Sequence, residues 1–156
     1  MPTCSPGLGR DALGLDREVI SSRLARLDEY LSILEELAQV EEGAFVADPR
    51  SHGSAERFLH LAIECVFDVG THCIAALGLR RPEQYSDILP TLAEASIISR
   101  ITATELESLA GFRNRLVHDY FRLDHRRVHL FIRTRLDGFR LFAQDVARWL
   151  DSSPDS

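Results

Sequence analysis

The sequence predicts an all-α protein, an antiparallel bundle of four main helices and one short helix. Apolar residues recur at steps of three and four through most of the chain, which is the period of a helix with one buried face. No segment alternates apolar and polar residues as a half-buried strand would. Residues that favour helix ends separate the periodic segments, so the helices can be placed in order along the chain.

The first helix is expected to run from Asp16 to about Glu42, where Gly43 can end it. Its apolar residues form a seam with alternating steps of four and three, as in a helical bundle. The seam consists of Ile20, Leu24, Leu27, Leu31 and Leu34.

The second helix is expected from Ser54, as N-cap, to about Leu77. It is apolar around much of its circumference and should be the central helix, and Gly70 within it suggests a close helix crossing. One line of polar residues interrupts this surface at steps of four: His60, Glu64, Asp68 and His72. A metal site and a solvated stripe both fit these residue types, although no spacing here is specific for a metal.

A short helix is predicted over residues 86–95, with Pro90 in or near its first turn. Thr102 and Glu105 fit a capping box, in which each side chain bonds the other residue's backbone N–H. The box would open a helix that continues to Tyr120. This helix carries the polar residues on which the functional interpretation depends.

Asp124 is the predicted N-cap of a final helix that ends near residue 150. We therefore expect one helical domain over residues 15–151. Residues 1–14, with several prolines and glycines, are expected to be a disordered lead, and residues 152–156 a frayed tail.

Composition indicates a soluble cytoplasmic protein. No apolar run approaches the ~20 residues of a membrane span, and the N-terminus lacks the basic and apolar parts of a secretory signal. Cys4, Cys65 and Cys73 form no CxxC pair, which favours reduced thiols. Cys65 and Cys73 are expected to be small core residues.

The net charge of −6 argues against a general nucleic-acid binder, but the charge is unevenly distributed. Residues 1–110 hold 9 arginines and 18 acids, whereas residues 111–156 hold 9 arginines and 6 acids. Every basic residue is arginine, which suits bidentate phosphate contact but can equally reflect a GC-rich genome. The basic excess of the C-terminal part holds under either explanation.

The stretch from Gly111 to Arg122 concentrates polar groups of different chemistry. On a helix, Asn114 and His118 stand at i and i+4 and share a face. Arg113, Val117 and Tyr120 would form the adjacent stripe. A purely structural interpretation is that the arginines and the histidine cap carbonyls and suit the negative end of the helix dipole.

The pattern Arg113-Asn114-x-x-x-His118-x-Tyr120 resembles the Arg-x4-His-x-Tyr motif of HEPN toxins of the HepT type, which pair with minimal nucleotidyltransferase antitoxins. The likeness extends over most of the chain, roughly from Leu15 to Asp151. The resemblance implies a HEPN-like bundle, a two-fold dimer, and the toxin role in a type II toxin–antitoxin system. It also implies a metal-independent endoribonuclease and neutralisation by adenylylation of Tyr120.

The resemblance also implies roles for individual residues. His118 would act as acid or base at neutral pH, Arg113 as a fixed cation for the phosphate, and Asn114 as a group that orients His118 or donates to a phosphoryl oxygen. Glu64 and Asp68 would hold Arg113 and His118 in place. Arg115 and Arg122 would contact RNA phosphates. No cofactor and no metal are expected.

Two alternatives remain at this point. The chain can be a non-catalytic HEPN subunit that holds a nucleotide or docks the nucleotidyltransferase. It can also be a plain helical dimerisation module, in which alanine substitutions in the motif change stability alone. A nuclease assay separates the first alternative from the toxin.

Overall fold

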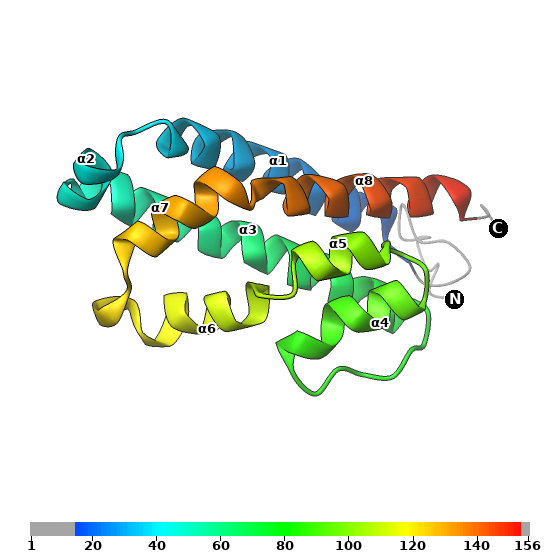
Figure 1. Ribbon diagram of the computed structural model, residues 1–156. Helices are drawn as coiled ribbons and strands as arrows, with labels where there is room; N and C mark the ends of the chain where they lie inside the picture. The colour runs from blue at the N-terminus through cyan, green and yellow to red at the C-terminus, as the bar shows by residue number, and fades with distance from the viewer. Residues whose placement is uncertain (1–14, 154–156) are drawn as a thin grey trace, which may run out of the picture.

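The computed structural model describes residues 15–153, except for the side chain of Tyr120, and confirms the all-α fold (Figure 1). Within this range the helices in chain order are α1 (Arg17–Ala38), α2 (Glu42–Ala47), α3 (Pro49–Ala76), η1 (Tyr85–Asp87), α4 (Ile88–Glu94), α5 (Arg100–Glu105), α6 (Leu109–His118), η2 (Tyr120–Arg122), α7 (His125–Thr134) and α8 (Leu136–Ser152). The predicted disordered lead, residues 1–14, and most of the predicted tail lie outside the described residues.

Helix α3 is the central helix, as predicted. It packs against α1, α2, α4, α6 and α7, and Figure 1 shows it running through the middle of the bundle. The helix starts at Pro49 with Asp48 as N-cap, so the prediction that Ser54 is the N-cap was wrong. Proline is favoured in the first turn because the N–H it lacks has no helical partner there.

Helix α3 is also long and apolar enough to cross a membrane by length and composition alone, contrary to the prediction that no segment approaches a membrane span. However, 56% of its most apolar window is buried inside the fold. The central helix of a soluble protein meets the same test, so this is weak evidence for a membrane.

Two further boundaries differ near the start of the chain. Helix α1 ends at Ala38, not at Glu42, and a second short helix, α2, follows where a loop was expected. The Glu41 carboxylate caps α2 by accepting bonds from the backbone N–H groups of Gly43 and Ala44. Gly43 therefore lies inside a helix instead of ending one.

The predicted motif helix is divided in two. Ser99 caps α5 through a bond from the Thr102 N–H, and the Thr102 hydroxyl donates to Asp145 of α8 at 2.6 Å. Thr102 is therefore an interior residue of α5, and the predicted capping box was wrong. The helix stops at Glu105, and α6 starts afresh at Leu109.

The predicted last helix is also broken. Asp124 is its N-cap, as predicted, and accepts a bond from the Arg126 N–H. The helix ends at Thr134, however, and α8 begins at Leu136 after a break at Arg135. Figure 1 shows α7 and α8 following one another along the bundle with a bend between them.

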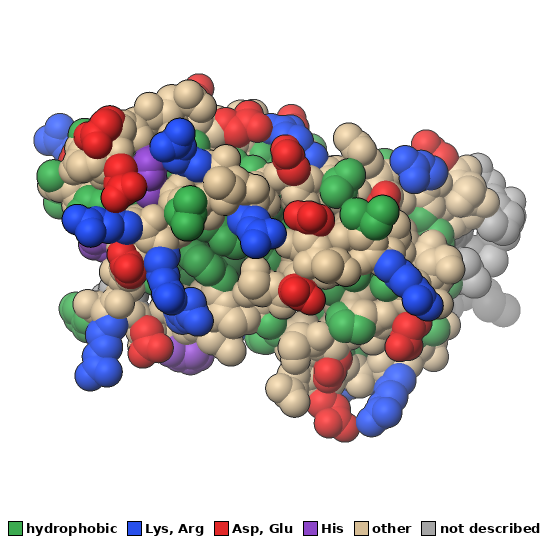
Figure 2. Space-filling view, viewed as in Figure 1, with side chains coloured by type: hydrophobic (Ala, Val, Ile, Leu, Met, Phe, Trp, Pro, Cys, Tyr) green, Lys and Arg blue, Asp and Glu red, His purple; other side chains and the backbone are tan. Residues whose placement is uncertain are grey.

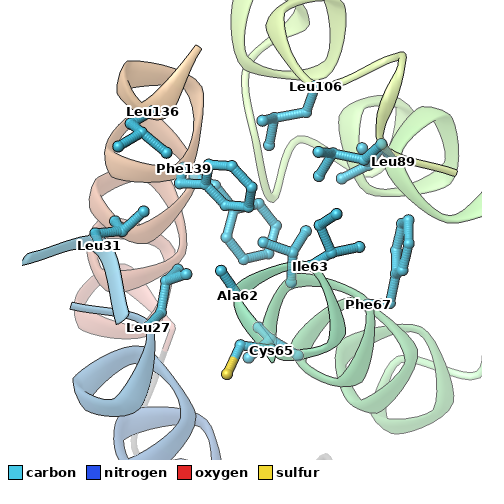
Figure 3. Packing of buried hydrophobic residues seen from close by; sticks show 14 of the residues in the cluster. Leu27, Leu31, Ala62, Ile63, Cys65, Phe67, Leu89, Leu106, Leu136 and Phe139 are labelled. Carbon is cyan, nitrogen blue, oxygen red and sulfur yellow. The ribbon is translucent and has the colours of Figure 1, made fainter. Parts of the chain in front are cut away.

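One apolar core joins α1, α2, α3, α4, α6, α7 and α8, and Figure 3 shows the part of it where side chains from α1, α3, α4 and α8 meet. The close crossing expected at Gly70 is present, because a Cβ there would stand 2.5 Å from Cγ2 of Ile88 on α4. Cys65 and Cys73 are buried core residues, as predicted. Burial raises the pKa of the Cys65 thiol to about 11 and that of the Cys73 thiol to about 12.

Candidate active site

Helix α6 is held by one apolar face and presents the other to solvent. Leu109 and Phe112 are buried, and the Phe112 ring lies 4.7 Å from that of Phe131 on α7. The opposite face carries Asn114 and His118, both exposed. Helical geometry places these two residues on one surface, as expected, and His118 is the last residue of the helix.

Arg113 is fixed from two sides. Its Nε donates a 2.9 Å hydrogen bond to Oε1 of Glu64 on α3, and its guanidinium carbon lies 4.2 Å above the centre of the Tyr85 ring. The Tyr85 ring in turn packs against Phe67 at 5.0 Å. Within residues 15–153, Nη1 and Nη2 of Arg113 make no hydrogen bond, so these nitrogens can receive a phosphate.

Glu64 and Asp68 were predicted to hold Arg113 and His118, but the structure shows only Glu64 in contact with Arg113 and neither acid bonded to His118 among the described residues. Oε1 of Glu64 also lies 3.4 Å from Nε2 of His60, one turn earlier on α3. Asp68 instead faces Arg23 of α1 at 4.0 Å, and both side chains are about half exposed. Burial, opposed by Arg23 and reinforced by Glu64, raises the pKa of Asp68.

The polar line on α3 does not form the metal site that its residue types allowed. His72 accepts a bond from the backbone N–H of Asp16 at 3.1 Å, and Asp68 turns to Arg23, so the four residues serve different neighbours. Among the described residues, the one group of three that could hold a metal ion lies elsewhere, at His52, Glu56 and His125.

Arg115 and Arg122 line one groove, and Arg113, Asn114 and His118 are not among its walls. The groove has a volume of about 400 Å³. It lies between α6, η2 and the start of α7, and its walls are Phe112, Arg115, Asp119, Arg122, Leu123, Asp124 and Arg127. Three arginines against two aspartates give it a net positive wall. On the face that Figure 2 shows, acids and arginines are interspersed.

Tyr120 is not on the helical stripe predicted for it. Helix α6 ends at His118, Asp119 is its C-cap with φ −119° and ψ 28°, and Tyr120 begins the separate turn η2. The expected alignment of Arg113, Val117 and Tyr120 on one helix was therefore wrong. The backbone places Tyr120 two residues beyond His118, within the segment of residues 112–127 that forms the groove.

Sequence reasoning missed Tyr85 and the contact of His60 with Glu64. Tyr85 lies 28 residues before Arg113, directly before the short helix predicted over residues 86–95, so no local spacing connects the two. His60 was part of the polar line, and its i, i+4 spacing from Glu64 on one helix is the signal that could have found this contact. An aromatic residue beside a cation would have been visible only in three dimensions.

Comparison with known proteins gives one family model and several relatives that resemble this chain. The model of the family described as "Ribonuclease HepT-like" matches residues 27–146. Among curated proteins, YutE of Bacillus subtilis, named as a candidate RNase, is 27% identical over 97 residues, covering 62% of this chain and 67% of YutE. The tRNA nuclease HepT of Aphanizomenon flos-aquae is 23% identical over 132 residues, covering 85% of this chain and 90% of that protein.

Solved structures share the fold. YutE, described there as a cytosolic protein of unknown function, superposes with a TM-score of 0.79 at 24% identity, over 91% of this chain and 96% of YutE. A tri-AMPylated HEPN toxin of Shewanella oneidensis, in complex with its MNT antitoxin, superposes with a TM-score of 0.77 at 21% identity, over 85% of this chain and 98% of the toxin. At these identities the likeness shows the fold.

Proposed function

The chain belongs to the HepT-like ribonuclease family, and from that premise we propose that it is the toxin of a type II toxin–antitoxin system. It is a metal-independent endoribonuclease, acts in the cytoplasm, and is silenced by a nucleotidyltransferase antitoxin. The observation that supports this most is the immobilised Arg113, held by Glu64 and Tyr85 on the helix that ends at His118. A catalytic cation must be fixed before the reaction to stabilise charge that develops during it.

The chemistry follows from the two side chains. His118 removes the proton from a ribose 2′-OH, the 2′ oxygen forms a bond to phosphorus, and the bond from phosphorus to the 5′ oxygen breaks. The Nη1 and Nη2 groups of Arg113 stabilise the negative charge on the crowded phosphate. The products carry a 2′,3′-cyclic phosphate and a 5′-OH. Asn114 orients His118 or donates to a phosphoryl oxygen.

The leaving 5′ oxygen needs a proton, and one motif offers a single histidine. A two-fold dimer that brings two copies of His118 into one cleft supplies the second acid–base group. Arg115 and Arg122, which line the groove beside α6, would flank the cleft as phosphate contacts, so RNA binding should weaken as salt rises. The dimer is tested with mixed dimers purified through two different tags. If both histidines are needed, a dimer of wild type with His118→Ala retains far less than half the wild-type activity. A chain that stays monomeric at micromolar concentration contradicts this arrangement.

The nuclease is tested with purified protein, total RNA and tRNA in excess chelator. We expect cleavage with cyclic phosphate ends, lost in Arg113→Ala and in His118→Ala while circular dichroism stays unchanged. Arg148→Ala, which removes an exposed arginine of α8, is the matched control and should cleave normally. A folded wild type that cleaves nothing supports the non-catalytic subunit instead. Activity that returns only with a divalent metal overturns the mechanism.

Antitoxin control is assigned to Tyr120. A phenol with a pKa near 10 is a weak nucleophile without help from a base or cation, and the partner's own metal supplies that help. Attached AMP would place a bulky anion where RNA phosphate binds. Coexpression with the partner followed by intact-mass measurement should show AMP on wild type, and fewer adducts on Tyr120→Phe. Equal numbers of adducts on both proteins would exclude Tyr120 as the acceptor.

A further inference from the structure

Three side chains that the proposed reaction does not use converge at one end of the bundle. His52 and Glu56 lie one turn apart near the start of α3, and His125 is the first residue of α7. Nδ1 of His125 lies 2.7 Å from Oε1 of Glu56, and Nδ1 of His52 lies 3.7 Å from the same oxygen. The two imidazole rings stack with centroids 3.7 Å apart and planes 16° from parallel.

We propose that His52, Glu56 and His125 bind a divalent transition-metal ion, with Zn²⁺ as the best match. One ligand atom from each residue lies within 4.8 Å of the others. Two imidazoles and one carboxylate are ligands that Zn²⁺ prefers, and three protein ligands leave the fourth position of a tetrahedral ion to water. Mg²⁺ and Ca²⁺ fit less well because they prefer oxygen ligands.

The geometry needs only side-chain adjustment. In a tetrahedral site with bonds of about 2.0–2.1 Å, ligand atoms stand roughly 3.3 Å apart. The distances of 2.7 and 3.7 Å to the Glu56 oxygen bracket that spacing. The parallel rings must turn toward a common point, and the terminal torsion of histidine is soft enough to allow it. The side chains are 17%, 19% and 30% exposed, so an ion can enter from solvent.

A second observation points to a ligand at this place. Nδ1 of His52 is buried, yet it makes no hydrogen bond within residues 15–153. Buried polar atoms in folded proteins nearly always have a partner, and a missing one calls for an unobserved water or ion. A metal ion would bind Nδ1 of His52. It would also take the place of the hydrogen between Nδ1 of His125 and Oε1 of Glu56, and the neutral His125 ring would then carry its proton on Nε2.

The site would connect two elements that sequence separates by 69 residues. It ties the start of α3 to the start of α7, directly after the segment that carries Arg122 and Tyr120. Metal binding would therefore stabilise the fold and fix the far end of that segment. It does not depend on nuclease activity, because no ligand belongs to the proposed catalytic pair.

The test uses tag-free full-length chain in a Cys4→Ser background, so that this thiol cannot compete for metal. After chelator treatment, the protein is titrated with Zn²⁺ alone by calorimetry and with Co²⁺ alone by visible absorption. We expect one equivalent per chain and the absorption bands of a tetrahedral Co²⁺ site. Zn²⁺ at a hundredfold excess over its Kd should raise Tm by roughly 5–10 °C.

Variants distinguish this site from ordinary histidine binding. Glu56→Gln, His52→Ala and His125→Ala should each weaken binding at least about tenfold, and the pair of histidine changes should abolish it. His118→Ala is the matched control: it removes an exposed histidine and should bind metal as the parent does. Failure to bind one equivalent, or unchanged binding when His52 and His125 are both replaced, overturns the proposal. RNA cleavage in chelator is a separate readout, so failure here leaves the nuclease test unaffected.

Discussion

Replacing Glu64 by alanine should lower RNA cleavage through Arg113 alone. Glu64 touches no reacting atom in the proposed mechanism, but its Oε1 accepts the only hydrogen bond that Arg113 donates from its side chain within the described residues. The side chains are 29% and 18% exposed, so the pair is only partly screened by water. Glu64 is thus a positioning residue.

The magnitude follows from the contact. A hydrogen bond to a charged group contributes about 1.5–3 kcal/mol. If the loss appears entirely as poorer placement of the guanidinium in the transition state, kcat/KM falls roughly 10–150-fold. The Tyr85 ring still supports Arg113 from the other side, so the loss should stay below that of Arg113→Ala.

A double-mutant cycle tests this reasoning. Cleavage is measured for wild type, Glu64→Ala, Arg113→Lys and the double variant, with urea unfolding of each. Since Glu64 acts through the guanidinium, its substitution should cost little more once lysine stands at 113. Glu64→Gln keeps an acceptor and should recover part of the activity.

Asp68→Asn is the matched control. It removes a carboxylate one turn further along α3, where the 4.0 Å pair with Arg23 is about half exposed and contributes at most ~1 kcal/mol. Cleavage should be unchanged. The positioning role is refuted if Glu64→Ala cleaves RNA as wild type does. It is also refuted if Glu64→Ala lowers kcat/KM by the same factor whether residue 113 is arginine or lysine.

Four other substitutions test the fold and the site. Gly70→Ala should lower the free energy of unfolding by about 1–3 kcal/mol in urea, because the new Cβ would meet the stiff Ile88 side chain. Gly53→Ala is the control in the same helix: a Cβ there would have no neighbour within 4 Å, so the substitution should raise stability by up to ~1 kcal/mol. Equal effects of the two substitutions would contradict the close crossing. Tyr85→Leu should remove the cation–π contact with Arg113, which contributes about 0.5–2 kcal/mol, and should reduce RNA cleavage roughly 2–30-fold. Unchanged cleavage would show that the Tyr85 ring does not support Arg113. Hydrogen bonds from the backbone N–H groups of Gly43 and Ala44 lower the pKa of Glu41 in the folded protein. The charged Glu41 carboxylate therefore contributes to stability above the pKa it has in the unfolded chain, and this contribution is lost as the pH falls through its pKa in the folded protein. Glu41→Gln should therefore lower the urea midpoint at pH 7 and lose this effect in acid; a difference that persists in acid would argue against the charged cap.

The bundle was predictable because its signals are local and repeated. The seam residues Ile20, Leu27, Leu31 and Leu34 of α1 are all buried, and Asp124 caps α7 as expected. The breaks were not predictable, because distant contacts decide them. Thr102 matched a capping box, but its hydroxyl donates to Asp145, 43 residues away.

The site shows the same division. The motif and its link to Glu64 followed from a family resemblance, whereas Asp68 was assigned wrongly for a geometric reason. A step of four residues turns a helix by about 400°, so each polar residue of α3 lies ~40° further round than the one before. Glu64 consequently faces Arg113, and Asp68 has already rotated toward Arg23 of α1. Tyr85 had no sequence signal.

This rotation has a consequence for how the family can vary in length. One unbroken helix aims Glu56 at α7, Glu64 at α6 and Asp68 at α1. Inserting or deleting one residue between Glu56 and Glu64 would turn one part of α3 by ~100° relative to the other. At least one of the contacts that Glu56, Glu64 and Asp68 make with neighbouring helices would then be lost. No such alignment between helices passes through the connection over residues 78–84, so we expect an insertion there to be tolerated better than one within α3.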